Sequence, residues 1–239
     1  MKDKEIDDIL KKAASTSPGV NPRILRTIAG SIESSLSPVR PLPPPWLMTA
    51  ALLLVCTAVA LAGAALNGFL GIKKMNLSMR MLIFPALGIL AWLAASTLVR
   101  QMVPGSLRRI SSGTTLAISS VGLAGVFALM FRDYRTDHFI SAGIACLLTG
   151  LLYAVPAALL SWLLLRRGFA VSPVSAGCVA GTLAGLAGVG MLELHCPNFE
   201  AAHVLVWHTA VVPLSGALGA VAGWALRFRS SSRARTAAP

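Results

Sequence analysis

Charged side chains are scarce in this sequence and absent from long stretches of it. Only 13% of its 239 residues are charged, whereas about a quarter are charged in a typical soluble domain. The charge-free runs are about 19 to 27 residues long, and about 20 helical residues cross a bilayer core. The fold class predicted is all-α, a polytopic membrane bundle of six transmembrane helices at 46–70, 81–103, 113–131, 139–165, 171–192 and 202–226.

Several functions lose support from what the sequence does not contain. No acidic or basic residue lies deep inside a predicted span, although ion- or proton-coupled transporters usually carry one there. The four cysteines form no C-x-x-C pair, which counts against a thiol oxidoreductase. Neither paired aspartates nor a Ser-His arrangement lies in the spans, which counts against an intramembrane protease. We therefore expect no enzyme, and a small channel or transporter with an incidental tail is the alternative function.

Lysine and arginine are unevenly distributed between the two sides of the predicted membrane domain. The segments on the N-terminal side carry 16 of the 21, and the positive-inside rule places that side in the cytoplasm. Both termini are thus expected in the cytoplasm, with the chain in a bacterial inner membrane. Because topology accounts for the net charge of +12, no direct contact with nucleic acid is expected. The basic segment 227–239 is interpreted as a disordered cytoplasmic tail that favours anionic membrane lipid.

The first 45 residues form a short cytoplasmic tail ahead of the membrane domain, 46–226. An amphipathic helix is predicted to begin at Pro22, since proline is favoured at the first helical position. Its apolar stripe consists of Ile24, Leu25, Ile28, Ile32 and Leu36. The stripe predicts a partner, either a groove on another protein or the membrane surface. The groove is favoured because the tail is only weakly cationic, and a leader without any partner is the third interpretation.

The segment 37–45, Ser-Pro-Val-Arg-Pro-Leu-Pro-Pro-Pro, follows the stripe. Its prolines favour an extended polyproline II conformation. We expect it to act as a stiff spacer between the tail and the first span.

Residues suited to metal or redox chemistry collect on the predicted periplasmic side. The candidate sensor residues there are Cys146, Cys196, His195, His203 and His208, with His138 nearby. Imidazole and thiolate suit zinc or copper, but H-C-x6-H-x4-H is not a standard zinc-ligand spacing. If the loop after the fifth span folds inward, the thiols of Cys146 and Cys196 come within disulfide reach. A redox switch, a metal site and unrelated structural residues are all left open.

No permanently bound cofactor is expected from the sequence. A metal ion that binds transiently at the periplasmic face is the one exception left open, and its identity is unknown. The number of copies of the chain in the functional protein is also left open.

Three stretches carry a family resemblance. They are Ser37-Pro-Val-Arg-Pro-Leu-Pro-Pro-Pro-Trp46, Leu163-Leu-Leu-Arg-Arg-Gly168, and Leu194-His-Cys-Pro197 followed by His203 and Trp207-His208. Together they resemble the NrsF-type family of six-span membrane anti-sigma factors, named as negative regulators of sigma-F. The resemblance implies that the cytoplasmic tail holds an extracytoplasmic-function sigma factor inactive. It also implies that cysteines in the outer half, here Cys146 and Cys196, receive a stress signal.

The tail departs from the expected family pattern and from other anti-sigma factors. It is longer ahead of the Pro-rich segment than the resemblance leads us to expect. No Cys or His precedes Cys56, which excludes the zinc-bearing tail fold that many other anti-sigma factors use.

Overall fold

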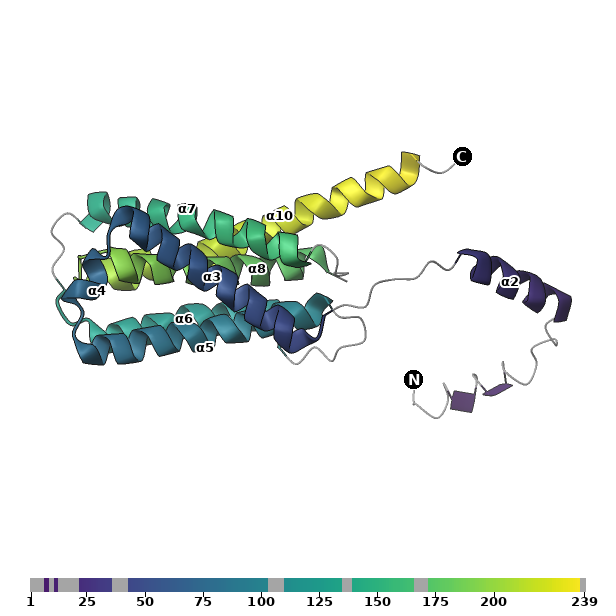
Figure 1. Cartoon of the computed structure of the whole chain (residues 1–239), viewed down its shortest axis with the longest axis horizontal. Helices are drawn as coiled ribbons and strands as arrows, with labels where there is room; N and C mark the ends of the chain where they lie inside the picture. The colour runs from purple at the N-terminus through teal and green to yellow at the C-terminus, as the bar shows by residue number, and fades with distance from the viewer. Residues whose placement is uncertain are drawn as a thin grey trace. The chain divides into compact units, whose positions relative to one another are not determined.

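The computed structural model contains helices and no strands among the residues that it describes, which confirms the predicted all-α class (Figure 1). The described residues are 7–8, 11–12, 22–35, 43–102, 110–134, 139–165 and 172–236, without the side chains of 32–35 and 227–236. The chain divides into two compact units, residues 1–41 and 42–239.

The first unit contains the amphipathic helix α2, Pro22–Ser35, which begins at the predicted proline. Three side chains of its apolar stripe, Ile24, Leu25 and Ile28, are 53%, 52% and 49% exposed. Ile32 lies further along the same helix. Leu36 and most of the Pro-rich segment lie outside the described residues. The described part of the stripe is therefore open to a partner.

The second unit contains six helices long and apolar enough to cross a membrane, as predicted. They are α3 (Pro45–Asn67), α5 (Leu77–Met102), α6 (Ser112–Met130), α7 (Phe139–Leu165), α8 (Pro173–His195) and the span Ala201–Leu226. The last span is built from α9 (Ala201–His203), the π-helix η1 (Val204–His208) and α10 (Thr209–Thr236). The short helix α4 (Leu70–Lys74) connects α3 to α5.

Four helix ends differ from the prediction by three residues or more. The second span begins at Leu77 instead of residue 81 and so includes Arg80. The first span stops at Asn67, because Gly68 has a φ of 93° and leaves the helix. The fifth span, predicted to end at Leu192, continues to His195 and includes the acidic Glu193. The last helix continues to Thr236 instead of ending in a disordered tail from residue 227. No glycine or proline lies between residues 227 and 236 to end that helix.

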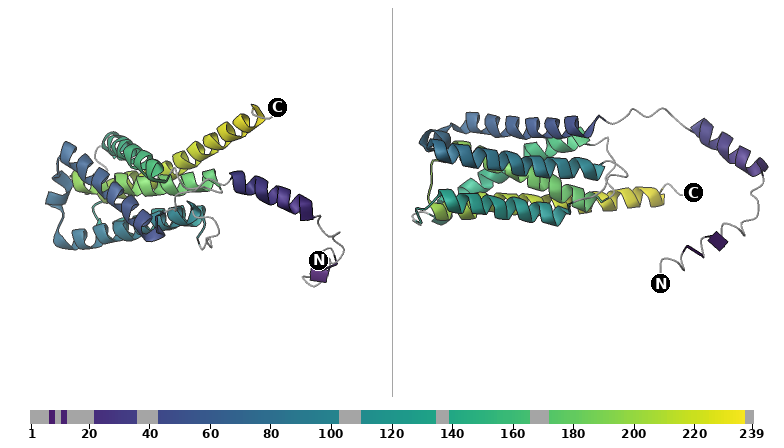
Figure 2. Two further views of the ribbon diagram at one scale, coloured as in Figure 1. Left: turned by 45° about the vertical axis from the view of Figure 1, so that its right-hand side comes forward. Right: turned by 90° about the horizontal axis from the view of Figure 1, so that it is seen from below.

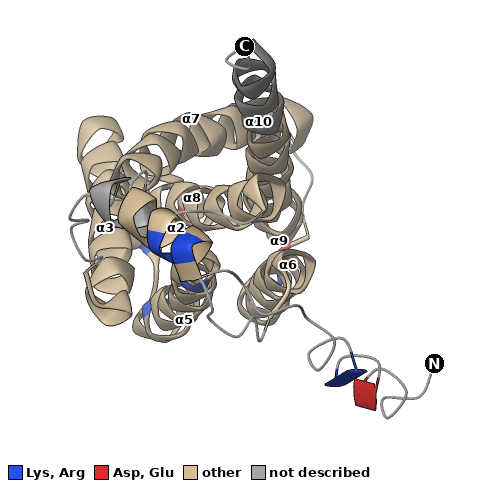
Figure 3. Ribbon diagram, turned by 90° about the vertical axis from the view of Figure 1, so that its right-hand side faces the viewer, with Lys and Arg blue, Asp and Glu red and all other residues tan. Residues whose placement is uncertain are grey.

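The helix α8 is the centre of the bundle. It contacts each of the other five spans, and the end-on view shows it surrounded by them (Figure 3). Within its most apolar stretch 67% is buried, against 22–44% in the other spans. Gly177 and Gly181 of α8 lie directly against the backbone carbonyls of Gly219 and Ser215 in α10. Glycines four residues apart in the sequence of the fifth and sixth spans predict such close packing, and the structure confirms it, although only α8 is central.

One end of the bundle, which we call the α4 end, is formed by α4 and by the turn 196–200 between α8 and α9 (Figures 1 and 2). Lys74 Nζ donates a hydrogen bond to the carbonyl oxygen of Pro197 over 3.3 Å. A Cβ at Gly71 of α4 would lie 2.6 Å from the carbonyl oxygens of Glu193 and Cys196. The absence of a side chain at Gly71 therefore lets α4 pack over the end of α8.

Candidate functional site

Four of the five candidate sensor residues meet just inside the α4 end. Cys146 comes from α7, Cys196 directly follows α8, His203 ends α9 and His208 ends η1. One ligand atom from each residue lies within 4.8 Å of those of the other three. Cys196, His203 and His208 are at most 4% exposed. Residues far apart in the sequence thus form one cluster of two thiols and two imidazoles, called here the Cys2His2 cluster.

The two cysteines of the cluster lie in direct contact. Their Sγ atoms are 3.5 Å apart, and both thiols are free. The backbone N–H of Cys196 donates to the carbonyl oxygen of Leu192 over 2.6 Å, which continues the last turn of α8 and turns the side chain inward. The inward fold of this loop, on which the approach of the two thiols depended in the sequence, is therefore present. The hydrogen bond with Cys146, followed by burial, raises the pKa of the Cys196 thiol above its usual value.

A buried carboxylate orients one of the two imidazoles. Glu193 and His208 are each 1% exposed. The Nδ1–H of His208 donates to Oε1 of Glu193 over 2.7 Å. This hydrogen bond leaves Nε2 of His208 facing the cluster without a hydrogen-bond partner among the described residues. In the sequence Glu193 lies next to the loop that carries Cys196, and in the structure its partner is a histidine inside the bundle.

The π-helix η1 brings the two histidines of the last span to the same side. His203 and His208 are five residues apart, and in a regular α-helix they would point about 140° away from each other. In the structure their ring centroids are only 5.3 Å apart, and Nε2 of His203 lies 3.7 Å from Sγ of Cys196. π-Turns within α-helices are frequent at functional sites. The wider turn therefore lets both imidazoles of the last span join the Cys2His2 cluster.

His195, the fifth candidate sensor residue, lies outside the cluster. Its Nδ1–H donates to the carbonyl oxygen of Gly68 over 3.0 Å, at the junction of α3 and α4. Adjacent residues on a helix point about 100° apart, so Cys196 and His195 leave the end of α8 in different directions. His138 lies outside the described residues. Sequence proximity to Cys196 was therefore a poor guide to membership of the cluster.

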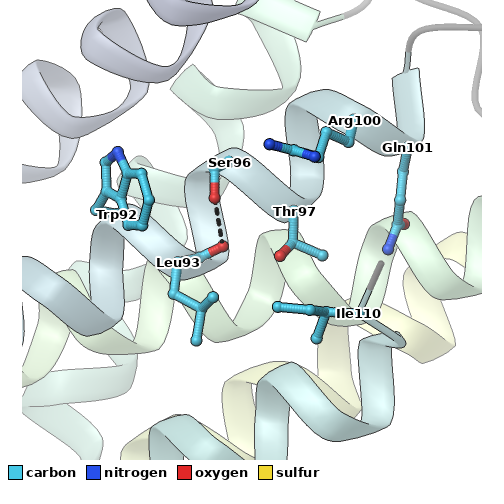
Figure 4. A pocket seen from close by; sticks show the side chains of 7 residues that line it. All are labelled: Trp92, Leu93, Ser96, Thr97, Arg100, Gln101 and Ile110. Carbon is cyan, nitrogen blue, oxygen red and sulfur yellow. Dashed lines mark hydrogen bonds between the residues drawn. The ribbon is translucent and has the colours of Figure 1, made fainter. Parts of the chain in front are cut away.

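A small cavity is lined by the second half of α5 and by Ile110, which precedes α6 (Figure 4). Its volume is about 150 Å³, and it is lined by Trp92, Leu93, Ser96, Thr97, Arg100, Gln101 and Ile110. Ser96 Oγ is occupied by a 3.0 Å hydrogen bond to the carbonyl oxygen of Leu93. Small-molecule sites usually measure about 300–1,000 Å³. The cavity therefore adds no support to the transporter alternative.

Comparison with known proteins identifies one family. The family model described as NrsF, negative regulator of sigma F, matches residues 33–228. No curated protein and no solved structure matches the chain. The matched residues include all six spans and every member of the Cys2His2 cluster. Since the match extends over most of the sequence, the chain belongs to the NrsF family of negative regulators of sigma F.

Proposed function

We propose that this chain is an anti-sigma factor of the bacterial inner membrane. Its N-terminal tail, residues 1–45, holds an extracytoplasmic-function sigma factor inactive. An envelope, redox or metal stress received on the periplasmic side releases that sigma factor. Membership of a family of negative regulators of sigma F carries the proposal, because such a regulator must contact a sigma factor.

The exposed stripe of α2 supports the tail as the contact. Ile24, Leu25 and Ile28 are about half exposed, and an amphipathic helix of this kind commonly binds in an apolar groove. Burying one such side chain fully is worth about 1.5–3 kcal/mol. The family match begins at residue 33, so the role of α2 is inferred from its own surface. When a sigma factor is bound to this helix at the membrane, the contact covers surfaces that the sigma factor needs to bind core polymerase.

The proposed orientation places the α4 end, and with it the Cys2His2 cluster, towards the periplasm. It is supported by the excess of lysine and arginine on the opposite side of the membrane domain. Reporter enzymes that work only in the cytoplasm should be active when fused to either terminus. Activity of a periplasm-specific reporter at either terminus would contradict this orientation.

Replacing Ile28 with aspartate should weaken sigma-factor binding by more than tenfold. The substitution removes one apolar contact and introduces an unpaired charge at the interface, and a tenfold loss corresponds to about 1.4 kcal/mol. The measurement is the dissociation constant between the full-length chain in detergent and an extracytoplasmic-function sigma factor of the same bacterium.

The matched control for this variant is Gly30→Asp, which adds the same charge on the opposite side of α2. A Cβ at Gly30 meets no atom within 4 Å, so the control should bind with nearly unchanged affinity. If Ile28→Asp bound as tightly as the control, the stripe of α2 would not be the contact.

A further inference from the structure

We propose that the Cys2His2 cluster is a tetrahedral binding site for one zinc ion, and that Glu193 positions one of its ligands. The four ligands would be Cys146, Cys196, His203 and His208, whose ligand atoms already lie within 4.8 Å of one another. The site would be the sensing part of the proposed function. Metal binding to it can nevertheless be measured in the absence of any sigma factor.

The distances between the ligand atoms fit a single tetrahedral ion. With Zn–S bonds of about 2.3 Å and Zn–N bonds of about 2.0–2.1 Å, two sulfurs lie about 3.8 Å apart and a sulfur and a nitrogen about 3.5 Å apart. The Sγ atoms of Cys146 and Cys196 are 3.5 Å apart, and Sγ of Cys196 is 3.7 Å from Nε2 of His203. Small side-chain adjustments would therefore complete the coordination without moving the helices.

The environment of His208 is that of a metal ligand. Its Nδ1–H is held by Glu193 over 2.7 Å, while Nε2 is buried and has no hydrogen-bond partner among the described residues. Ligating histidines almost always donate their other N–H to a carboxylate or carbonyl, which fixes the ring and its tautomer. The Glu193–His208 pair has this arrangement. A bound metal ion would give the buried Nε2 the partner that it lacks.

Charge and ligand type favour zinc. Two thiolates neutralise a divalent ion, so the first coordination sphere carries no net charge in a buried environment where an uncompensated charge is costly. Closed sites of two cysteines and two histidines are a common structural zinc arrangement. Thiolate ligands also favour softer ions such as Cu(I). Such ions could therefore compete with zinc for the site.

Zinc bound here would join three parts of the bundle. The ligands come from α7, from the turn after α8 and from the α9–η1 segment. Phe139 and Trp207, with ring centroids 5.5 Å apart, pack α7 against η1 on the same side of the bundle. Loss or exchange of the ion would consequently remove or weaken a link between α7, the end of α8 and the last span.

Zinc content and cobalt spectroscopy on the full-length chain in detergent test the site. The chain, purified under reducing conditions, should bind one zinc ion per chain. After chelation, cobalt(II) alone should restore the absorption of a tetrahedral site with sulfur-to-cobalt charge transfer. Cys196→Ser and His208→Ala should lose the stoichiometric ion. Glu193→Gln should keep the spectrum but bind zinc about 10- to 100-fold more weakly.

Two control variants separate the site from general damage to the fold. Cys178→Ser and His195→Gln change the same residue types outside the cluster and should bind zinc as the wild type does. The site is refuted if the wild-type chain binds no zinc and gives no tetrahedral cobalt spectrum, or if Cys196→Ser and His208→Ala bind zinc normally. The wild-type spectrum decides the matter even if these variants fail to fold. Absence of zinc with intact sigma-factor binding would refute the site and leave the proposed function standing.

Discussion

Replacing Gly181 with leucine should prevent the bundle from assembling. Gly181 lies on the central helix α8 with its Cα directly against the backbone carbonyl of Ser215 in α10. A side chain there cannot be relieved by a rotamer change, because its neighbour is backbone. Small residues four positions apart, such as Gly177 and Gly181, allow membrane helices to approach closely. We expect destabilisation of about 3 kcal/mol or more, the upper part of the range for overpacked interiors, and an aggregated protein in size-exclusion chromatography.

The control for this substitution is Gly125→Leu on α6, where a Cβ meets no atom within 4 Å. That variant has the same change in hydrophobicity and volume, so it should elute and melt like the wild type. Equal behaviour of the Gly181 and Gly125 variants would show that the α8–α10 contact does not limit stability.

Replacing Cys146 or Cys196 with serine should abolish induction of the sigma factor's target genes. The two Sγ atoms are 3.5 Å apart, so any thiol chemistry that joins them or bridges them through a metal acts at one point between α7 and α8. A signal acts only through unequal affinity for two states, and a shift from about 1% to 99% release needs about 5.5 kcal/mol. A disulfide or a metal with three or four ligands can supply this energy, whereas one surface histidine cannot.

The measurement for these two variants is target-gene output with and without a thiol oxidant, zinc, cadmium or chromate. The ratio of induced to uninduced output should fall to about one in both. Cys178→Ser is the matched control, since this thiol lies in α8 outside the cluster, and its induction should be normal. Unchanged induction in both the Cys146 and Cys196 variants would leave these thiols with a structural role only.

The spans could be predicted because membrane insertion depends on length and charge, which are local properties of the sequence. Even α6, the shortest span, is correctly placed between Arg109 and Arg132. The boundary at Glu193 was wrong because the prediction ended the fifth span before a charged residue. A buried carboxylate is tolerated in the span because it has a buried hydrogen-bond partner, His208. That partner lies 15 residues away in another helix, so it could not be recognised from the local sequence.

The site could be predicted only in part. The approach of Cys146 and Cys196 followed from placing both near one face of the bundle. The pairing of His203 with His208 depends on the π-helix η1, and no local residue pattern indicates such a turn. His195 was included because it adjoins Cys196, although helix geometry sends the two side chains in different directions. The proposed zinc ion also departs from the expectation of no resident cofactor, since a four-ligand set becomes visible only in three dimensions.

Retention of a sigma factor by the full-length chain tests the central claim most directly. The chain would be immobilised in detergent and incubated with each extracytoplasmic-function sigma factor of the same bacterium, in parallel with a chain that lacks residues 1–41. This truncation removes one compact unit and leaves the membrane unit whole. The account predicts stoichiometric retention by the full-length chain and none by the truncated one. Equal retention by both chains, or retention by neither, would contradict it.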